Sequence, residues 1–584
     1  MGSPSRHVSA SPSISQIRVD PVRPPCDSRL PTWDTIQSVA ETYLLYCDCQ
    51  PLPLFHRQSF IRSLRTRDPE LLFAVLALAS RFSDGTIRAS QIELVDGYVE
   101  ASRTIISKRV FDGDVELSTI QSLCLLALVD FTDGKKRRAS VHSSLAMSLA
   151  HNAGLTGETY APVSRSQKEE RRRCFWSLFL LKRLHGADFM VLDFATDENF
   201  PRYPETTGKV INHEATGNQS FSASPEPSVD QGIVAYAIQM SEIWFKVTRY
   251  AWRRSIPNEL PPWSPQSEYS TILGQQMDAE TRMPFTHRFA PSKFSQRSID
   301  ELNGTRDYWG PWLLIQFLYH TNLCLLNHPL LISLRLRNFK GVIPEIFLQH
   351  TSDLISTHAS WIINFIDMLD SKQFIVTDPF LAHCVAIIAT IYLQESFVED
   401  MTKRREKQEH FEKCLKFIRG FGSYWPHVGR IADKLHKLSE TVSSTQVASD
   451  EPIRQNRKLL IDLGQFFEIL EYSSSSEIAG SARNMFGPSL SSTIPASRTE
   501  MAQTTILPEP TRVERQEFGT PSASNTPTTA VPDHSAYMNF AMTPVVTNTG
   551  AFQFSDDELA VLAENFFQQR TDDGNANWWN MGNL

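Results

Sequence analysis

The residues of this sequence with the most obvious capacity for chemistry are Cys47, Cys49 and His56, which lie close together in the chain. Thiolate and imidazole groups are preferred zinc ligands, but a structural zinc site needs four ligands, usually supplied by spaced cysteine pairs. Two thiols and one histidine in an apolar segment fall short of that number. We therefore interpret all three as core residues and expect neither a metal nor a cofactor.

Motifs of the common enzyme classes are absent from the sequence. There is no His-Glu-x-x-His motif, no Gly-x-Ser-x-Gly nucleophile turn and no glycine-rich phosphate loop. A helical enzyme that binds metal and diphosphate would need carboxylates clustered on a helix face. The paired Asp572 and Asp573 stand instead in a stretch rich in Gly and Asn. We predict that the protein is not an enzyme.

The densest basic run of the chain is Lys135, Lys136, Arg137 and Arg138. Such runs serve as nuclear import signals, but they also occur at solvated helix starts, and the sequence leaves both interpretations open. The chain as a whole has 57 basic and 65 acidic residues, a net charge of −8. This balance gives no general attraction to nucleic acid, so direct DNA binding stays uncertain.

The last segment, residues 551–584, combines acidic and aromatic side chains. Six acidic residues stand there against the single base Arg570, and the aromatics include Phe566, Phe567, Trp578 and Trp579. Repulsion between carboxylates keeps such a segment extended, and its exposed aromatics suit the apolar grooves of coactivators. We interpret these four aromatics as an activation site. A terminal helix that packs on its own domain is the alternative.

Apolar residues recur with helical spacing from Trp33 to about residue 438, and strand-like alternation is nearly absent. A helix is expected to begin at Pro69, and others to end at Gly134 and Gly154. Two capping boxes are expected, as is one helical ion pair. These are Ser118 with Gln121, Ser166 with Glu169, and Glu169 with Arg173. The expected later helices are 234–252, 312–326, 351–369, 379–397, 407–421 and 453–472.

The expected fold is all-α, a large helical regulatory domain with disordered N- and C-terminal tails. Residues 201–230 and 256–298 are expected to be long surface loops, because they are rich in Pro, Ser and Thr. The apolar stretch 312–334 contains too many polar residues for a membrane span and is expected to be a buried helix. The expected segments are a disordered 1–32, a domain 33–440, a helical extension 441–472, a disordered linker 473–550 and the acidic segment 551–584.

Several motifs resemble the fungal-specific transcription factor domain, the middle homology region of zinc-cluster regulators. The resemblance rests on YLLYCDCQPLPLFHRQSF, ELLFAVLALASRF, STIQSLCLLALVDFTDGKKRRASVHSSLAMSLAHNAGL and EERRRCFWSLFLLKRLHG, with further likeness near LLIQFLYHTNLCLLNHPLL, DPFLAHCVAIIATIYLQ and Trp425-Pro426. Two positions depart from the family pattern. Lys182 stands where the family has Asp, and Gly186-Ala187-Asp188 replaces Gly-Arg-Pro.

The resemblance implies a transcription regulator in a fungal nucleus, controlling a metabolic or secondary-metabolite gene set. Relatives carry six zinc-binding cysteines before the domain, whereas only Cys26 precedes it here, so no zinc cluster and no DNA-binding residue is expected in this chain. The expected partners are coactivators or the transcription machinery, and a second copy or a complete zinc-cluster factor as a dimer partner. No membrane association is expected. The alternatives are an adaptor that acts through such a factor and a truncated gene product.

Overall fold

The computed structural model describes residues 30–82, 89–185, 200–205, 230–252, 259–336, 339, 343–396, 401–447, 463–470 and 472. These residues form helices joined by turns and loops, and none of them lies in a strand. The predicted all-α class is therefore confirmed. All of them fall in one of the two units into which the chain divides. No helix among them is both long and apolar enough to cross a membrane.

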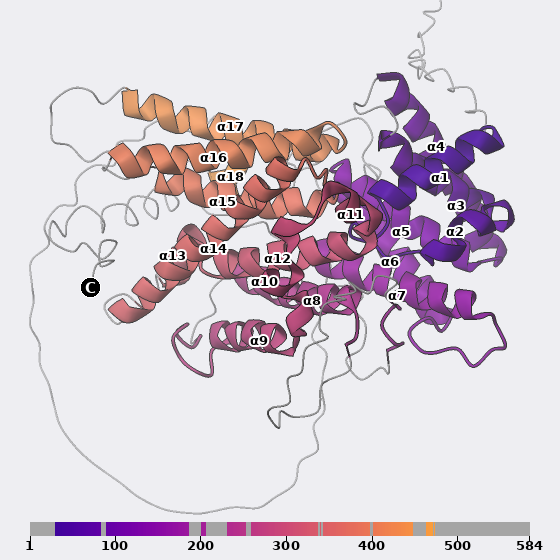
Figure 1. Cartoon of the computed structure of the whole chain (residues 1–584), viewed down its shortest axis with the longest axis horizontal. Coiled ribbons are helices and arrows are strands. Elements are labelled where there is room, and N and C mark those ends of the chain that lie inside the picture. The colour runs from indigo at the N-terminus through magenta and orange to yellow at the C-terminus, as the bar shows by residue number, and fades with distance from the viewer. Residues whose placement is uncertain are drawn as a thin grey trace, which may run out of the picture. The chain divides into compact units, whose positions relative to one another are not determined.

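The first group of helices surrounds α3, whose residues are buried on every side. Helix α3 packs on α1, α4 and α5, and α5 packs in turn on α6 and α7 (Figure 1). As predicted, α3 begins at Pro69, because proline at the first helical position loses no hydrogen bond. The helices of this group are α1 (Trp33–Tyr46), α2 (Arg57–Ser63), η1 (Leu64–Thr66), α3 (Pro69–Ala79), η2 (Ser80–Phe82), α4 (Ala89–Asp112), α5 (Leu117–Thr132), α6 (Lys136–Asn152) and α7 (Arg165–His185).

Both predicted glycine stops are confirmed. Gly134 and Gly154 follow α5 and α6 with positive φ angles of 75° and 63°, which suit a residue without a side chain. After α6, the N–H of Leu155 donates to the carbonyl of Ala150 at 2.9 Å. This bond is the one that defines a Schellman ending and satisfies a terminal carbonyl.

The predicted capping box of α5 is wrong by two residues. The box pairs Glu116 with Thr119, and α5 begins at Leu117. Ser118 and Gln121 lie inside the helix, and both are buried. The carboxylate of Glu116 is the better cap here, because a negative charge is favoured at a helix N-terminus.

The predicted capping box of α7 is displaced in the same direction. The Oγ of Ser164 accepts the backbone N–H of Gln167 at 3.2 Å, and the Gln167 side chain accepts the backbone N–H of Ser164 at 3.1 Å. Ser166 bonds instead to Ser59 at 2.8 Å, from one hydroxyl to the other. Glu169 is held by an ion pair with Arg173, so neither residue is available as a cap.

The second group of helices is built around α12, which packs on α8, α14 and α15 (Figure 1). Helices α15, α16 and α17 then pack on one another in sequence. The helices of this group are α8 (Ile233–Trp252), α9 (Glu268–Arg282), η3 (Phe285–His287), α10 (Phe289–Ser292), η4 (Phe294–Gln296), α11 (Ile299–Gly304), α12 (Arg306–Leu326), α13 (Pro329–Leu336), α14 (Glu345–Lys372), α15 (Pro379–Glu395), α16 (Met401–Gly422), α17 (Pro426–Val447) and α18 (Leu463–Leu470).

The prediction of a long loop over 256–298 is wrong. Helix α9 begins after Ser267, whose hydroxyl accepts the backbone N–H of Ser270, and it buries Tyr269 and Ile272. Composition misled the prediction, because Ser and Pro also occur at helix starts. The expected helix 312–326 is confirmed by α12, which ends at Leu326. The rest of the apolar stretch 312–334 is not a continuation of that helix but belongs to α13, which begins at Pro329.

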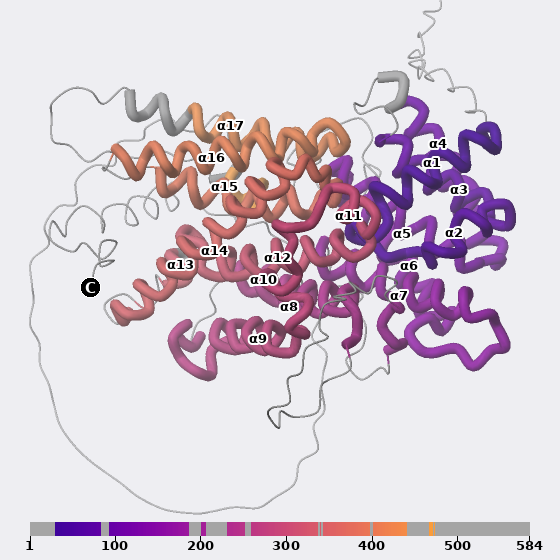
Figure 2. The backbone as a smooth tube through the Cα atoms, in the orientation of Figure 1, coloured from indigo at the N-terminus to yellow at the C-terminus, as the bar shows by residue number. Residues whose placement is uncertain are grey.

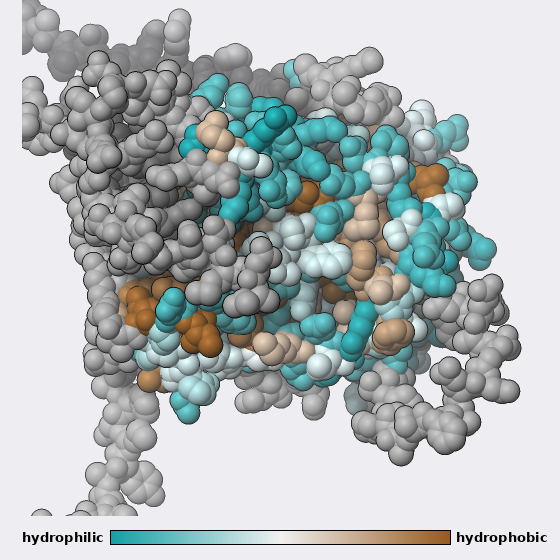
Figure 3. Space-filling view, turned by 60° about the vertical axis from the view of Figure 1, so that its left-hand side comes forward, coloured by the Kyte–Doolittle hydropathy of each residue, from teal (hydrophilic) through white to brown (hydrophobic). Residues whose placement is uncertain are grey.

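One hydrophobic core runs through both groups, from Ile36 in α1 to Tyr472 after α18. The tube in Figure 2 follows the chain from the indigo first group to the orange α16 and α17. Residue 440 lies inside α17, and α18 packs on α15 and α17, so packing continues past the boundary at 440. On the face in Figure 3, hydrophilic residues predominate among those coloured and the apolar ones form small separate groups.

Candidate functional site

Cys47, Cys49 and His56 lie on the turn between α1 and α2, where each has a structural role. Both thiols are buried, and burial raises the pKa of each well above its usual value, so both stay protonated. His56 Nδ1 lies 2.9 Å from Ser59 Oγ and 3.4 Å from Ser166 Oγ. Among the residues that the structure describes, no three His, Cys, Asp or Glu side chains are placed so that together they could hold a metal ion.

Next to these cysteines lies a network of buried charges that joins the α1–α2 turn to α7. Arg173 is paired with Glu169 at 2.8 Å, which confirms the predicted ion pair, and donates to the carbonyl of Glu205 at 2.5 Å. Asp48 is paired with Arg57 at 3.1 Å. Burial raises the pKa of Asp48, and the charges of Arg57 and Arg173 oppose that rise. The arrangement fixes the α1–α2 turn and α7 in position.

The basic run begins at the N-terminal end of α6. Lys135 precedes the helix, and its Nζ lies 3.0 Å from Asp133. Arg137 is exposed, whereas Lys135, Lys136 and Arg138 are partly buried. The run thus forms the start of a helix, with Arg137 exposed and the other three residues partly buried, and its role in nuclear import stays a prediction.

Two sets of predicted positions lie outside the described residues. The four aromatics of the acidic segment, Phe566, Phe567, Trp578 and Trp579, are one set. Gly186, Ala187 and Asp188 are the other. Lys182 and Arg183, by contrast, are buried on α7, and Arg183 pairs with Glu242 on α8 while stacking over Phe179 and Phe245.

A polar seam connects the first group of helices to the second. Arg81 pairs with Asp133 at 3.0 Å and stacks over the ring of Trp425. Gln50 accepts the hydroxyl of Thr377 at 2.8 Å, and the indole N–H of Trp425 donates to the carbonyl of Thr377 at 2.9 Å. Hydrogen bonds depend on direction and distance more strongly than apolar contacts do, so this seam sets how the two groups fit together.

Three histidines and one tyrosine meet at the end of this seam, and we call them the histidine junction. They are His185 on α7, His383 on α15, His427 on α17 and Tyr472 after α18. The tyrosine ring lies 4.5 Å from His427, 4.9 Å from His383 and 6.2 Å from His185, between ring centroids. The sequence analysis did not identify the junction, because its members are far apart in the chain.

Burial keeps the histidines of the junction neutral. It lowers the pKa of His185 to about 3, of His383 to about 4 and of His427 to about 3. The Nε2 atoms of His383 and His427 lie 3.0 and 3.2 Å from the carbonyls of Leu470 and Tyr472. A carbonyl only accepts, so both Nε2 atoms carry the proton. Such imidazoles are hydrogen-bond donors and poor acid–base catalysts at neutral pH.

A second cluster has the outline of a catalytic arrangement. His287 Nδ1 lies 3.0 Å from the hydroxyl of Tyr308, and its Nε2 lies 3.0 Å from Asp230. The tyrosine is 1% exposed, and burial raises the pKa of its hydroxyl. The cluster connects the start of α8 to α12, and its tyrosine hydroxyl is buried.

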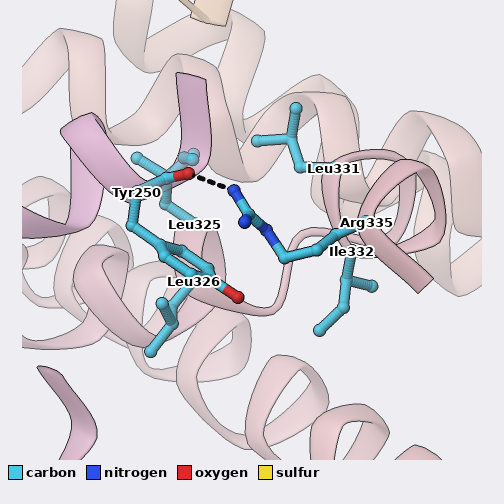
Figure 4. Close-up of a pocket in the computed structure, with 7 residues that line it drawn as sticks. Tyr250, Leu325, Leu326, Leu331, Ile332 and Arg335 are labelled. Carbon is cyan, nitrogen blue, oxygen red and sulfur yellow. Dashed lines mark hydrogen bonds between the residues drawn. The ribbon is translucent and has the colours of Figure 1, made fainter. Parts of the chain in front are cut away.

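One small cavity lies between α8, α12 and α13 (Figure 4). Arg335 extends into it, stacks over Tyr250 at 3.8 Å and donates to the carbonyl of that residue at 2.5 Å. Leu325, Leu331 and Ile332 line the rest. The space that water can enter is about 10 Å³, which is about one water molecule. It is too small for an effector.

Comparison with known proteins bears on residues 40–208, which match the family model described as "Fungal specific transcription factor domain". The chain contains a fungal specific transcription factor domain. The domain covers the second half of α1, all of α2–α7 and the charge network around Arg173. Gln50, Arg81, Asp133 and His185 lie within the domain. The seam residues Thr377 and Trp425 and the junction residues His383, His427 and Tyr472 lie outside it.

Curated relatives extend the similarity beyond the domain. The chain is 20% identical over 430 residues to "Zn(2)-C6 fungal-type transcription factor FTF1c" of Fusarium oxysporum f. sp. lycopersici, covering 68% of this chain and 44% of that protein. It is 24% identical over 446 residues to "Uncharacterized transcriptional regulatory protein C530.11c" of Schizosaccharomyces pombe, covering 70% and 53%. The chain thus spans about half the length of these relatives. No solved structure matches it significantly.

The family and the relatives carry the names of transcription factors and transcriptional regulators, which are not enzymes. These names agree with the prediction that the protein is not an enzyme. They also agree with the chemistry of the described residues, in which the potential nucleophiles and bases of the junction and of the cysteine turn are buried.

Proposed function

We propose that the protein is a transcription regulator that acts in a fungal nucleus. The observation that carries the proposal is the match of residues 40–208 to the fungal specific transcription factor domain. The similarity to fungal regulators over about two thirds of the chain supports it. The resemblance noted in the sequence further suggests a metabolic or secondary-metabolite gene set as the target.

In this proposal the fungal domain and the second helical group form a regulatory body. The acidic segment 551–584 contacts coactivators, and the basic run 135–138 serves nuclear import. The body has no cavity larger than about one water molecule at the site between α8 and α13, so regulation there by a small effector is not supported. In this proposal the helical body is regulated through contacts with other proteins.

The test is depletion of the protein in its native fungus, combined with transcript profiling and chromatin occupancy of a tagged chain. We expect a defined gene set to change, with the tagged chain found at the promoters of that set. Unchanged transcripts would contradict the proposal. If occupancy is lost on removal of a separate zinc-cluster factor, the protein acts as an adaptor to that factor.

Nuclear import is tested with a fluorescent fusion of the full chain. The changed chain carries Arg137→Ala and Arg138→Ala, and the control carries Arg282→Ala and Arg419→Ala, two exposed arginines that stand outside basic runs. We expect the first pair to shift the fusion toward the cytoplasm and the second pair to leave it nuclear, because import receptors bind clustered basic charge. A fully nuclear first pair shows that residues 135–138 only begin a helix.

A further inference from the structure

The most distinctive feature outside the fungal domain is the segment of residues 463–472, which we call the strap. The structure describes its residues 463–470, which form α18, and Tyr472. Helix α18 has only 8 residues, and a helix of that length is unstable in water by itself. Its helical form therefore depends on the surface on which it lies.

That surface is formed by α15 and α17. Phe466, Ile469 and Leu470 are 1% exposed or less, and Phe467 and Tyr472 are also buried. Phe466 contacts the ring of His328 with a centroid separation of 5.5 Å. The strap thus inserts an apolar face into the groove between the two helices, in the way that amphipathic helices bind the grooves of partner proteins.

Polar contacts fix the direction of the strap in this groove. His383 and His427 donate to the carbonyls of Leu470 and Tyr472, at the C-terminal end of α18 where the helix itself provides no partners. Glu468 pairs with Lys434 on α17. When the strap leaves, water can replace the strap as the hydrogen-bonding partner of both histidines and of Lys434. Release of the strap therefore leaves no buried charge without a partner.

We propose that the strap is an exchangeable ligand of this chain's own α15–α17 groove, bound within the same molecule and released as a unit. The apolar face supplies the affinity, while ordering of the strap opposes it, and these two contributions are of similar size. Release uncovers the groove and removes Tyr472 from the histidine junction. Because His185 belongs to the fungal domain, occupancy of the groove is communicated directly to that domain.

The experiment uses the full chain with a specific protease site inserted between residues 452 and 458. The probe is a fluorescein-labelled peptide of residues 459–474. After cleavage, we expect the labelled peptide to exchange with the freed strap and to bind at least about tenfold more tightly than to the uncleaved chain. The reason is that a tethered strap competes at a high effective concentration. A peptide carrying Phe466→Ala and Leu470→Ala is the control and should not bind.

A full chain with Glu468→Lys provides a second measurement without cleavage. The substitution places two positive charges together at Lys434, so the strap should be displaced more readily and the wild-type peptide should bind this variant better than the unchanged chain. The proposal is overturned if cleavage abolishes the cooperative unfolding transition, if the cleaved chain takes up no peptide, or if the uncleaved chain is a dimer that exchanges its straps between copies.

Discussion

Arg173 is held in a buried network by an ion pair and a hydrogen bond. Its guanidinium is 5% exposed and bonds to Glu169 and to the carbonyl of Glu205. A buried ion pair contributes little when intact, because desolvation opposes the attraction, but removal of one partner leaves a buried charge. The effect of Arg173 on stability is therefore best measured by replacing Arg173 alone and keeping Glu169.

We expect Arg173→Ala to lower the free energy of unfolding by about 3 kcal/mol, since the buried Glu169 loses its shorter ion pair and keeps only the 3.6 Å contact with Arg172. The matched control is Arg165→Ala, because Arg165 is 85% exposed and pairs with Glu205 at the surface. That substitution should cost about 1 kcal/mol or less. Urea denaturation followed by circular dichroism measures both. Equal effects of the two substitutions would contradict the buried network.

The junction histidines make stability depend on pH in a direction that follows from their lowered pKa values. Folding holds them neutral at values near 3 to 4, whereas an unfolded histidine titrates near 6.5. The unfolded state thus binds more protons below pH 6.5. The free energy of unfolding that the three neutral histidines contribute is fully present above pH 6.5. It is lost as the pH falls toward their folded-state pKa values of about 4 and 3.

His427→Gln tests this dependence, because the glutamine amide can still donate to the carbonyl of Tyr472 but cannot titrate. Below pH 6.5, each histidine contributes up to about 1.36 kcal/mol of lost stability per pH unit. We expect the variant to lose less stability than the wild type between pH 6.5 and 5. His350→Gln, at an exposed position on α14, should retain the wild-type slope. Urea titrations at several pH values decide between these outcomes.

At the scale of the helix, sequence patterns found most elements and placed their ends less well. The glycine stops after α5 and α6 were predictable, because a positive φ angle favours glycine locally. Both capping boxes were displaced, because several neighbouring Ser, Thr, Glu and Gln residues can cap, and tertiary contacts select among them. The hydroxyl of Ser166 hydrogen-bonds to that of Ser59, which is more than 100 residues away in sequence.

The displaced cap of α7 gives a direct test. Ser164→Ala should destabilise the protein by about 0.5–2 kcal/mol, because it leaves the backbone N–H of Gln167 without its partner. Ser118→Ala, at the position first expected to cap α5, should cost less than about 0.5 kcal/mol, since Ser118 lies inside the helix, where alanine is the better helix former. Thermal unfolding of the two variants measures the difference. A larger effect at Ser118 would mean that the cap of α5 is misassigned.

The candidate sites show the same division between local and long-range information. The cysteine turn and the pair of Glu169 with Arg173 were accessible from spacing alone. The histidine junction and the cluster of Asp230, His287 and Tyr308 were not, because the first combines residues from four separate segments and the second from three. Isolated histidines in apolar helices carry no signal about which partner they will meet.

At the scale of the whole molecule, the proposed division of labour separates a folded body from the acidic segment 551–584. The aromatics of that segment should matter more than any single acid, because buried rings must offset the entropy lost when the segment orders on a partner. The carboxylates serve mainly to keep the rings accessible.

Fusion of residues 551–584 to a foreign DNA-binding domain tests this assignment. We expect reporter activation by the wild-type segment and its loss when Phe566, Phe567, Trp578 and Trp579 are all changed to Ala. Asp556→Ala is the control and should reduce the signal little. A silent wild-type fusion, or a fourfold variant as active as the parent, would favour a terminal helix that packs on its own domain.

The position of Tyr472 in the histidine junction also has a consequence during synthesis. His185 is made 287 residues earlier, since 472 − 185 = 287. At translation rates of about 5–20 residues per second, roughly 14–57 s pass before the tyrosine that covers it exists. During that interval the apolar surface of α7, and later those of α15 and α17 once they have been made, are only partly covered. The nascent chain is therefore most vulnerable to aggregation, and most dependent on chaperones, shortly before α18 leaves the ribosome.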